Sequence, residues 1–379
     1  MAFDLLIKGG RVIDPAQGVD GIFDVAVRGS QIEAVSKDID PSNAKNCLDA
    51  SGKLITPGLI DLHNHVYHTG IPSLCVPADE VGVKAGVTTL VDAGSAGAAT
   101  FEGFASVLGA AVTDVSCFLN ILSGGLGAIE TVDWAEIDLD KTVAVSKEHS
   151  ELILGIKVLL MGPLVQREGI EVFMAARKAA TKAGIRLMVH IGDRHGPDPW
   201  ELTAQVLPLM EKGDILSHIF TANPGRVVTR SGSVLPEFLA ATRRGVALDV
   251  AHGSQHFCFE TAQRALEQGI MPTAISTDLS QLTLQGPVWS LTETMSKFLM
   301  LGLSITDVVR MTTINPARAL GMEGRIGSLK QGMAADVSIL GLQEGARDFI
   351  DSAGETRRGE AVLVPVTTVK SGRLVTCPQ

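Results

Sequence analysis

The middle of the chain repeats one pattern of polar and apolar positions. A segment of mixed character ends in glycine, and a short apolar run follows it, as in "TKAG" before "IRLMVHIGD" and "TRRG" before "VALDVAHG". Glycine is common where a helix ends in a left-handed turn, and continuous apolar runs are typical of strands buried in a parallel sheet. The pattern therefore predicts alternating helices and strands. The glycines that mark it are Gly86, Gly184, Gly213, Gly245 and Gly269.

The apolar runs also indicate the architecture. Eight units, each a strand followed by a helix, favour a (β/α)8 TIM barrel over residues 56–325, and one of the helices is predicted over residues 170–183. A doubly wound open sheet is the alternative, but no GxGxxG motif follows an early strand to support it. The candidate strands end near His63, Asp92, Leu122, Met161, His190, His218, Val250 and Thr277.

The two ends of the chain differ from this middle part. Residues 1–55 and 326–379 contain short apolar runs separated by Gly, Pro and Asp, a composition that predicts strands joined by turns. Because both ends have this character, we expect them to pair into one small, discontinuous β-sandwich domain beside the barrel.

Composition narrows the classes of function. Hydrophobic residues make up 45% of the chain, so a large core can be buried. The net charge of −10 and the aromatic content of 4% argue against a nucleic-acid-binding protein. Five widely spaced cysteines without a CxxC motif are typical of reduced thiols, and neither a signal peptide nor a membrane-spanning run is recognisable. We expect a cytoplasmic protein that acts on a small molecule, has no nucleic-acid or membrane partner, and is a monomer or a homo-oligomer.

Candidate metal ligands lie at the predicted strand ends. In "DLHNHVYH", His63 and His65 point to the same side of a strand because they are two residues apart. This pair alone fits metal binding and simple hydrogen bonding equally well. His190, His218 and Asp278 end three other predicted strands, and the carboxyl ends of barrel strands form the functional face. Histidine and carboxylate ligands without sulfur suit Zn²⁺, with Mn²⁺, Fe²⁺, Co²⁺ or Ni²⁺ as alternatives.

Lys157 is the most unusual residue of the pattern. It lies within "LILGIKVLLMG", where apolar residues stand on both sides. A buried ammonium group is costly without a partner, and burial lowers the pKa of the amine. A neutral amine can add CO2 to give an anionic carbamate that bridges two cations. The alternatives are a lysine that reaches solvent or one that pairs with a carboxylate.

These motifs resemble the amidohydrolase superfamily of metal-dependent hydrolases. "PGLIDLHNH", "GIKVLL", "HIG", "SHIF" and "STD" are similar to its first, fourth, fifth, sixth and eighth strand ends, and "TINPARALGM" to its closing helix. The resemblance implies a TIM barrel with a binuclear centre. It assigns His63, His65 and Asp278 to a buried α metal, His190 and His218 to a more exposed β metal, and a carbamate on Lys157 to the bridge. Asp278 is also the catalytic proton acceptor by this resemblance.

The resemblance also narrows the reaction. Dihydroorotases of this superfamily usually carry an arginine two residues after the HxH motif, where this chain has Tyr67. "VALDVAHGSQHF" and the segment 81–98 are instead similar to a deacetylase-like branch. We therefore expect hydrolysis of an amide or ester, with N-acetyl or O-acetyl small acids as substrates. A cyclic-amide hydrolase of the dihydroorotase or dihydropyrimidinase type is the alternative, and a non-catalytic scaffold is disfavoured because every ligand position is filled.

Four residues are candidates for substrate contacts. Tyr67 follows the HxH motif, and His252 and Gly253 follow the predicted seventh strand. Arg194 lies in the loop after the fifth strand, where it could hold a substrate carboxylate. Each has a simpler interpretation, namely packing at the barrel rim, shaping of a loop or contact with solvent. The segment "NPGRVVTRSGS" after His218 has the composition of a loop that can close over a substrate.

Overall fold

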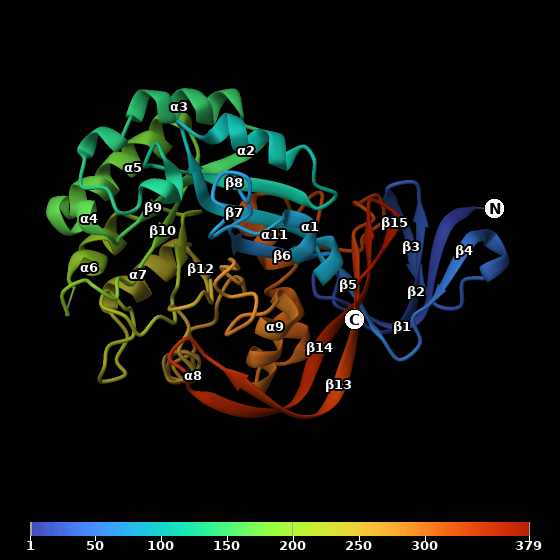
Figure 1. The fold of residues 1–379 in the computed structure, drawn as a ribbon. Coiled ribbons are helices and arrows are strands. Elements are labelled where there is room, and N and C mark those ends of the chain that lie inside the picture. Colours follow the sequence, from blue (N-terminus) through green and yellow to red (C-terminus); the bar gives the residue numbers. More distant parts are fainter. Residues whose placement is uncertain (1, 199, 379) are drawn as a thin grey trace.

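Figure 1 shows two β-sheets of different character in the computed structural model of the chain, which describes residues 2–198 and 200–378. A parallel seven-stranded sheet is surrounded by helices, and an eight-stranded sheet from both chain ends lies beside it. The N-terminus lies at the far edge of the smaller unit. This arrangement follows from the two hydrophobic patterns, since continuous apolar strands need cover on both faces.

The parallel strands form the barrel that the apolar runs predict. Their order in the sheet is the order of the sequence, from β6 to β12. An eighth short segment closes the ring, because Ala274 bridges Asp249 of β12 and Leu279 bridges Asn64 of β6. The open-sheet alternative is therefore wrong. The strands are β6 (Leu59–Asn64), β7 (Val87–Gly97), β8 (Asp114–Asn120), β9 (Ile153–Leu159), β10 (Arg186–His190), β11 (Ile215–Ser217) and β12 (Ala247–Asp249).

Helices cover the outside of this barrel (Figure 1). They are α1 (Ala78–Val81), α2 (Phe101–Leu108), α3 (Leu139–Glu148), α4 (Pro163–Glu168), α5 (Ile170–Ala183), α6 (Leu202–Val206), α7 (Pro236–Arg244), α8 (Phe259–Glu267), α9 (Leu291–Met300), α10 (Ile305–Arg310) and α11 (Ile314–Leu320). Short 3-10 turns span Pro41–Asn43, Val83–Ala85, Gly125–Ala128, Trp134–Glu136 and Leu207–Leu209. Within residues 2–198 and 200–378, no helix combines the length and the apolar character needed to cross a membrane.

The predicted helix over residues 170–183 is confirmed as α5. Phe173 and Ala176 on its inner face are fully buried against the barrel. The helix ends at Gly184, whose φ of 72° lies in the left-handed region, and α7 ends in the same way at Gly245 with a φ of 94°. A residue with a β-carbon adopts this conformation at a cost, so glycine sets the point where the chain turns back into the next strand.

Both chain ends build the second sheet, as predicted. Its order is β15-β14-β13-β5-β1-β2-β3, with β4 beside β1, so N-terminal and C-terminal strands meet where β5 pairs with β13. The sheet curls around its own core until the turn at Gly372 approaches the turn at Gly29. Its strands are β1 (Phe3–Asp14), β2 (Val19–Arg28), β3 (Gln31–Ser36), β4 (Ala44–Asp49), β5 (Leu54–Pro57), β13 (Val337–Ile350), β14 (Thr356–Lys370) and β15 (Arg373–Thr376).

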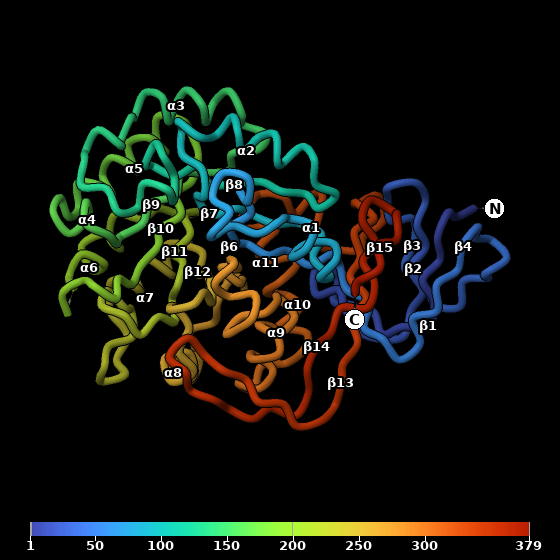
Figure 2. The backbone as a smooth tube through the Cα atoms, in the orientation of Figure 1, coloured from blue at the N-terminus to red at the C-terminus, as the bar shows by residue number. Residues whose placement is uncertain are grey.

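The hairpin of β13 and β14 reaches far beyond the small sheet. In Figure 2 its tube runs along the outside of α9 toward α8. Phe349 of β13 and Leu363 of β14 are buried in the barrel core, and Asp351 at the hairpin tip accepts a hydrogen bond from the backbone N–H of Phe259 at the start of α8. The domain division at residues 55/56 and 325/326 stays a prediction, because this hairpin packs on both units.

Asp14 connects the two ends of the chain, which generates a test of the discontinuous sheet. Its buried carboxylate accepts hydrogen bonds from Ser328 Oγ at 2.8 Å and from the backbone N–H of Leu329 at 2.7 Å. Asp14→Ala leaves these donors unpaired and should lower the free energy of unfolding by about 3 kcal/mol. Asp20→Ala removes an exposed ion pair with Arg11 from the same sheet and should cost less than about 1 kcal/mol. Urea denaturation measures both, and equal losses would contradict the role of Asp14.

Candidate metal centre

Six side chains from five barrel strands meet at one end of the barrel. Each lies within two residues of the carboxyl end of its strand or just beyond it. All but one are buried, and the exception, the Asp278 side chain, is 17% exposed. The structure thus brings together the whole predicted ligand set, although their roles as ligands remain a prediction. The residues are His63, His65, Lys157, His190, His218 and Asp278.

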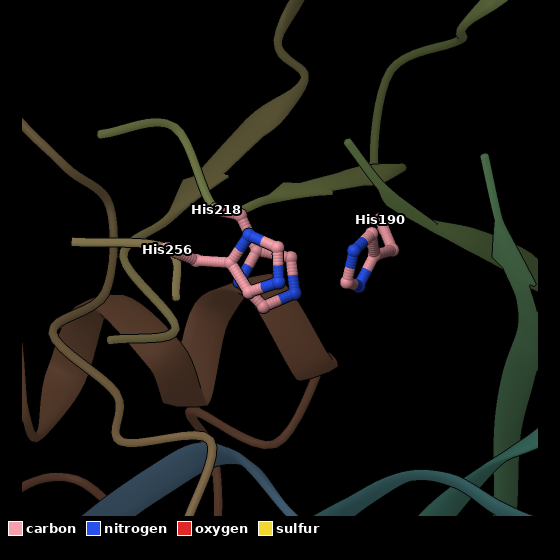
Figure 3. A group of neighbouring side chains, drawn as sticks. All are labelled: His190, His218 and His256. Carbon is pink, nitrogen blue, oxygen red and sulfur yellow. The ribbon is translucent and has the colours of Figure 1, made fainter. Parts of the chain in front are cut away.

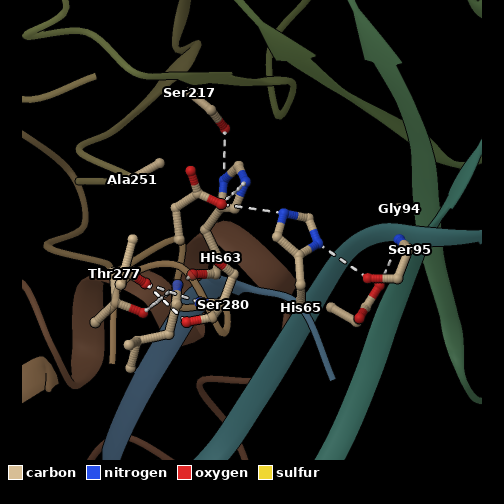
Figure 4. A network of polar contacts seen from close by, with 12 residues as sticks. His63, His65, Gly94, Ser95, Ser217, Ala251, Thr277 and Ser280 are labelled. Carbon is tan, nitrogen blue, oxygen red and sulfur yellow. Dashed lines mark hydrogen bonds and ion pairs between the residues drawn. The ribbon is translucent and has the colours of Figure 1, made fainter. Parts of the chain in front are cut away.

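Hydrogen bonds hold the Nδ1 atoms of the rings of His63 and His65, and Figure 4 shows those to Ser217 and Ser95. Nδ1 of His63 lies 3.0 Å from Asp249 Oδ2, and Nδ1 of His65 lies 2.9 Å from Ser95 Oγ. Because a carboxylate accepts, His63 carries its proton on Nδ1 and keeps a lone pair on Nε2. Such an outer partner sets the tautomer and orientation of an imidazole that binds metal. Burial raises the pKa of Asp249 to about 6, while hydrogen bonds from Ser276 and Ser217 oppose this rise.

His190 and His218 each present a buried nitrogen without a partner. Nε2 of both rings has no hydrogen-bond partner among the residues that the structure describes. Nδ1 of His218 donates to the carbonyl oxygen of Ala251 at 2.8 Å, which leaves the lone pair on Nε2. Burial is the main reason why the pKa values of both rings are well below their ordinary value. Two neutral imidazoles whose buried Nε2 atoms have no partner in the described part of the chain are suited to bind a cation.

Lys157 is buried among these rings. Its Nζ lies 3.1 Å from Nε2 of His63, and no carboxylate oxygen lies within 4.0 Å of it in the described part of the chain. Burial lowers the pKa of the amine to about 8, against the attraction of nearby carboxylates. Gly94 makes the room for this side chain, because a β-carbon there would lie 2.7 Å from Lys157 Cγ. The alternatives of a solvent-exposed or ion-paired lysine therefore do not apply.

Asp278 faces the histidines from the eighth strand. Its Oδ1 lies 3.0 Å from Nε2 of His65 and 3.8 Å from Nε2 of His63. Its backbone N–H donates to the carbonyl oxygen of His63 at 2.6 Å, so the first and eighth strands hold each other in register. His63, His218 and Asp278 place ligand atoms within 4.8 Å of one another, close enough for one cation.

The backbone at the strand ends is strained where the ligand candidates lie. Asp278, His218 and Ala251 have φ values of 52°, 68° and 43°, in the left-handed region that residues with a β-carbon rarely adopt. Each such residue costs on the order of 1–3 kcal/mol, and such strain gathers at functional sites. Gly253 lies beside Asp278 in space, and a β-carbon at Gly253 would lie 2.3 Å from the Asp278 carboxylate. Gly253 thus gives the carboxylate its space.

A small cavity of about 130 Å³ opens beside these side chains. Its volume suits a small acyl group, and apart from the ligand candidates its wall is mostly apolar. Ser254 and Ser280 supply hydroxyl groups there, and no arginine occurs among the described residues that line it. The apolar lining residues are Leu74, Ala93, Leu126, Ile129, Leu159, Met161 and Leu282.

The other substrate candidates lie less favourably for contact. Tyr67 is packed against Phe104 of α2, at 5.0 Å between ring centroids, and does not line this cavity. His252 is fully buried, and its Nε2 lies 2.8 Å from Nζ of Lys297. Arg194 is exposed on its loop. The geometry of Tyr67 fits packing at the barrel rim, and that of His252 fits a role in shaping its loop.

The loop after β11 lines a second cavity, which is distinct from the one beside the ligand candidates. Arg226 and Arg230 both pair with Asp198, at 2.7 and 2.5 Å, and line this cavity of about 400 Å³ together with Trp200. The carboxylate of Asp198 neutralises the two arginines in part. Whether this loop closes over a substrate stays a prediction.

Besides Asp249, Ser95 and Gly94, two further residues near the site, His256 and Lys297, were not among the candidates predicted from the sequence. The ring of His256 lies beside those of His190 and His218. Lys297 of α9 places its Nζ within hydrogen-bond distance of Nε2 of His252. His256 follows β12 in an irregular loop, so no strand parity indicates its direction. Lys297 lies on a helix 45 residues after His252, and no local pattern connects the two.

Known proteins match both the sequence and the fold. The profile of the amidohydrolase family matches residues 258–375. A deacetylase of Brucella anthropi is 33% identical over 365 residues, which are 94% of this chain and 89% of that protein. A crystal structure of an adenine deaminase superposes with a TM-score of 0.89 at 29% identity, over 99% of this chain and 100% of the other. A crystal structure of a dihydroorotase gives 0.87 at 29%, over 98% and 99%.

These likenesses extend over nearly the whole chain and agree with the site. Metal dependence is a property of this superfamily, and the structure gathers histidine and aspartate groups that could hold a metal ion. The match to the relative named deacetylase covers the barrel and both chain ends alike. The chain belongs to the amidohydrolase family of hydrolytic enzymes.

Proposed function

We propose that this enzyme is a binuclear metallohydrolase that releases a small acyl group from an amide or ester. The observation that carries the proposal is the set of six side chains at the barrel mouth. Among them, the buried Nε2 atoms of His190 and His218 have no hydrogen-bond partner in the described part of the chain. His63, His65 and Asp278 would hold the α metal and His190 and His218 the β metal. Nitrogen and oxygen ligands favour Zn²⁺, with Mn²⁺, Fe²⁺, Co²⁺ or Ni²⁺ as alternatives.

Lys157 would bridge the two metals as a carbamate. An ammonium group at this place would repel two divalent cations, whereas a carbamate would attract both. The lowered pKa leaves a substantial fraction of the amine neutral near pH 8, and the neutral amine is the form that reacts with CO2. The space that Gly94 leaves beside the lysine stem supports an extended side chain at this position.

Two bound metals would supply an activated hydroxide and polarise the scissile carbonyl group. The chain's own residues would then control the protons and the position of the substrate. Asp278 is partly exposed to the cavity and lies beside both His63 and His65, so its carboxylate can accept the proton of the attacking water and return it to the leaving group. The apolar wall would exclude further water from the acyl group.

The size and lining of the cavity support hydrolysis of an acyl group as the reaction. About 130 Å³ with apolar walls accommodates an acetyl group, and the Brucella anthropi relative is named a deacetylase. The dihydroorotase neighbour supports the alternative of a cyclic-amide hydrolase. Against this alternative, the lining has no arginine among its described residues to bind the carboxylate of dihydroorotate.

A substrate screen separates the two reactions. The Zn²⁺-loaded and Mn²⁺-loaded enzyme should release acetate from N-acetyl amino acids or O-acetyl hydroxy acids, measured by a coupled acetate assay. Dihydroorotate and dihydropyrimidines, followed by the loss of ring absorbance, should turn over far more slowly. Faster ring opening than acetate release would replace the deacetylase proposal by its alternative.

Lys157→Ala tests the bridge. The variant should lose at least one of two bound metal equivalents and most of its turnover, because the metals no longer share an anionic ligand. Acetate or propionate should restore part of both by taking the place of the carbamate. Metal analysis by mass spectrometry gives the measurement. The control is Lys370→Ala, which removes a buried lysine of the small sheet and should keep both metal equivalents. Full metal content in Lys157→Ala would refute the bridge.

Asp278→Asn tests the proton transfer. The amide keeps an oxygen that can bind metal but has no basic carboxylate, so kcat should fall by about 10²–10⁴-fold while metal remains bound. Steady-state kinetics and metal analysis measure the two effects separately. Asp138→Asn changes the exposed N-cap of α3 and should leave kcat unchanged. A kcat close to that of the unmodified enzyme in Asp278→Asn would exclude Asp278 as the proton acceptor.

A further inference from the structure

A third imidazole stands beside His190 and His218. Figure 3 shows the rings of His256 and His218 overlapping, with the ring of His190 facing them. The ring centroid of His256 lies 4.7 Å from that of His190 and 4.2 Å from that of His218. One ligand nitrogen from each of the three histidines lies within 4.8 Å of the other two. Three histidines in such a group are one of the arrangements that hold a catalytic zinc ion.

His256 is oriented like the other ligand candidates. Its Nδ1 lies 3.4 Å from Thr221 Oγ1, just as Nδ1 of His63, His65 and His218 each has an outer partner. Nε2 of His256 has no hydrogen bond within the described part of the chain, although the side chain is only 8% exposed. An imidazole held by Nδ1 and free at Nε2 is prepared to bind metal through Nε2.

The loop around His256 is held from several sides. The backbone N–H of Ser352, at the tip of the long hairpin, donates to the carbonyl oxygen of Phe257 at 2.9 Å. The backbone N–H of Cys258 donates to Phe220 at 3.1 Å, and Asn223 Nδ2 donates to the carbonyl oxygen of Gln255 at 2.9 Å. The small unit thus contributes to the site through its hairpin. A ring in a loop fixed on both sides loses little freedom when it binds a cation.

We propose that His256 is a direct ligand of the β metal and completes a face of three histidines with His190 and His218. The inference rests on the proposed binuclear site and adds to it a ligand from the loop after the seventh strand, β12. Because three neutral imidazoles can hold a divalent cation with a position left open for water, the β metal would have three ligands apart from the carbamate, as many as the α metal. Nitrogen ligands would also favour Zn²⁺ or Co²⁺ over Mg²⁺ in this place.

Metal titration of the complete chain tests this ligand. Metal-free enzyme is titrated with Co²⁺ in competition with a chelator, and the bound equivalents and their affinities are compared between variants. In His256→Asn one of the two equivalents should weaken by more than about 100-fold, since loss of an outer partner alone typically costs about 10–100-fold. Thr221→Val removes that outer partner of His256 and should cause the smaller loss. His149→Asn changes a histidine beside Glu102 on the outside of the barrel and should have no effect.

A second variant separates ligation from a structural role. His256→Ala leaves space for a free imidazole, and added imidazole should restore the weakened equivalent together with the visible absorption of the bound Co²⁺. The metal-free variants should unfold at the temperature of the unmodified protein. Two unchanged equivalents in His256→Asn, a loss no larger than that in Thr221→Val, or an absence of rescue by imidazole would each overturn the inference. An unmodified chain that takes up no metal would instead refute the proposed function.

Discussion

The site depends on the burial of Lys157, which has no ionic partner among residues 2–198 and 200–378. Lys157 lies inside the barrel among neutral imidazoles, and Gly94 leaves room for its stem. A charged amine at this place is costly, and two metal cations beside it would raise the cost further. Conversion to a carbamate changes the sign of the charge and removes this conflict. In our account the lysine and the metals therefore stabilise each other.

The rest of the fold holds the ligand atoms in position. Barrel strands bring distant residues to one rim, and the second ring nitrogens of the histidines are occupied by Asp249, Ser95 and the carbonyl oxygen of Ala251. Backbone strain at the strand ends is sustained because the neighbouring strands hold those residues from both sides. The small unit takes part as well, since its long hairpin supports the loop that carries His256. The site thus uses contacts from the whole chain.

The barrel and the positions of its ligand candidates could be predicted from the sequence, because the spacing of apolar residues and the topology of a parallel barrel determine them. The apolar runs and glycine stops placed the strand ends, and the common direction of parallel strands put His190 and Asp278 on one rim. Directions in irregular segments could not be predicted in this way. Tyr67 turns toward Phe104 and His252 toward Lys297 because of contacts with helices that lie elsewhere in the sequence. The position of His256 depends on the same kind of distant support.

The carbamate on Lys157 is the central claim, and it can be observed directly. The enzyme is loaded with Zn²⁺ in the presence of ¹³C-labelled bicarbonate, and carbon NMR is recorded after free bicarbonate has been removed. The account predicts one carbamate resonance that is present in the unmodified chain, is absent from Lys157→Ala, and is lost when a chelator removes the metal. A metal-loaded, active enzyme without a labelled carbamate would contradict it.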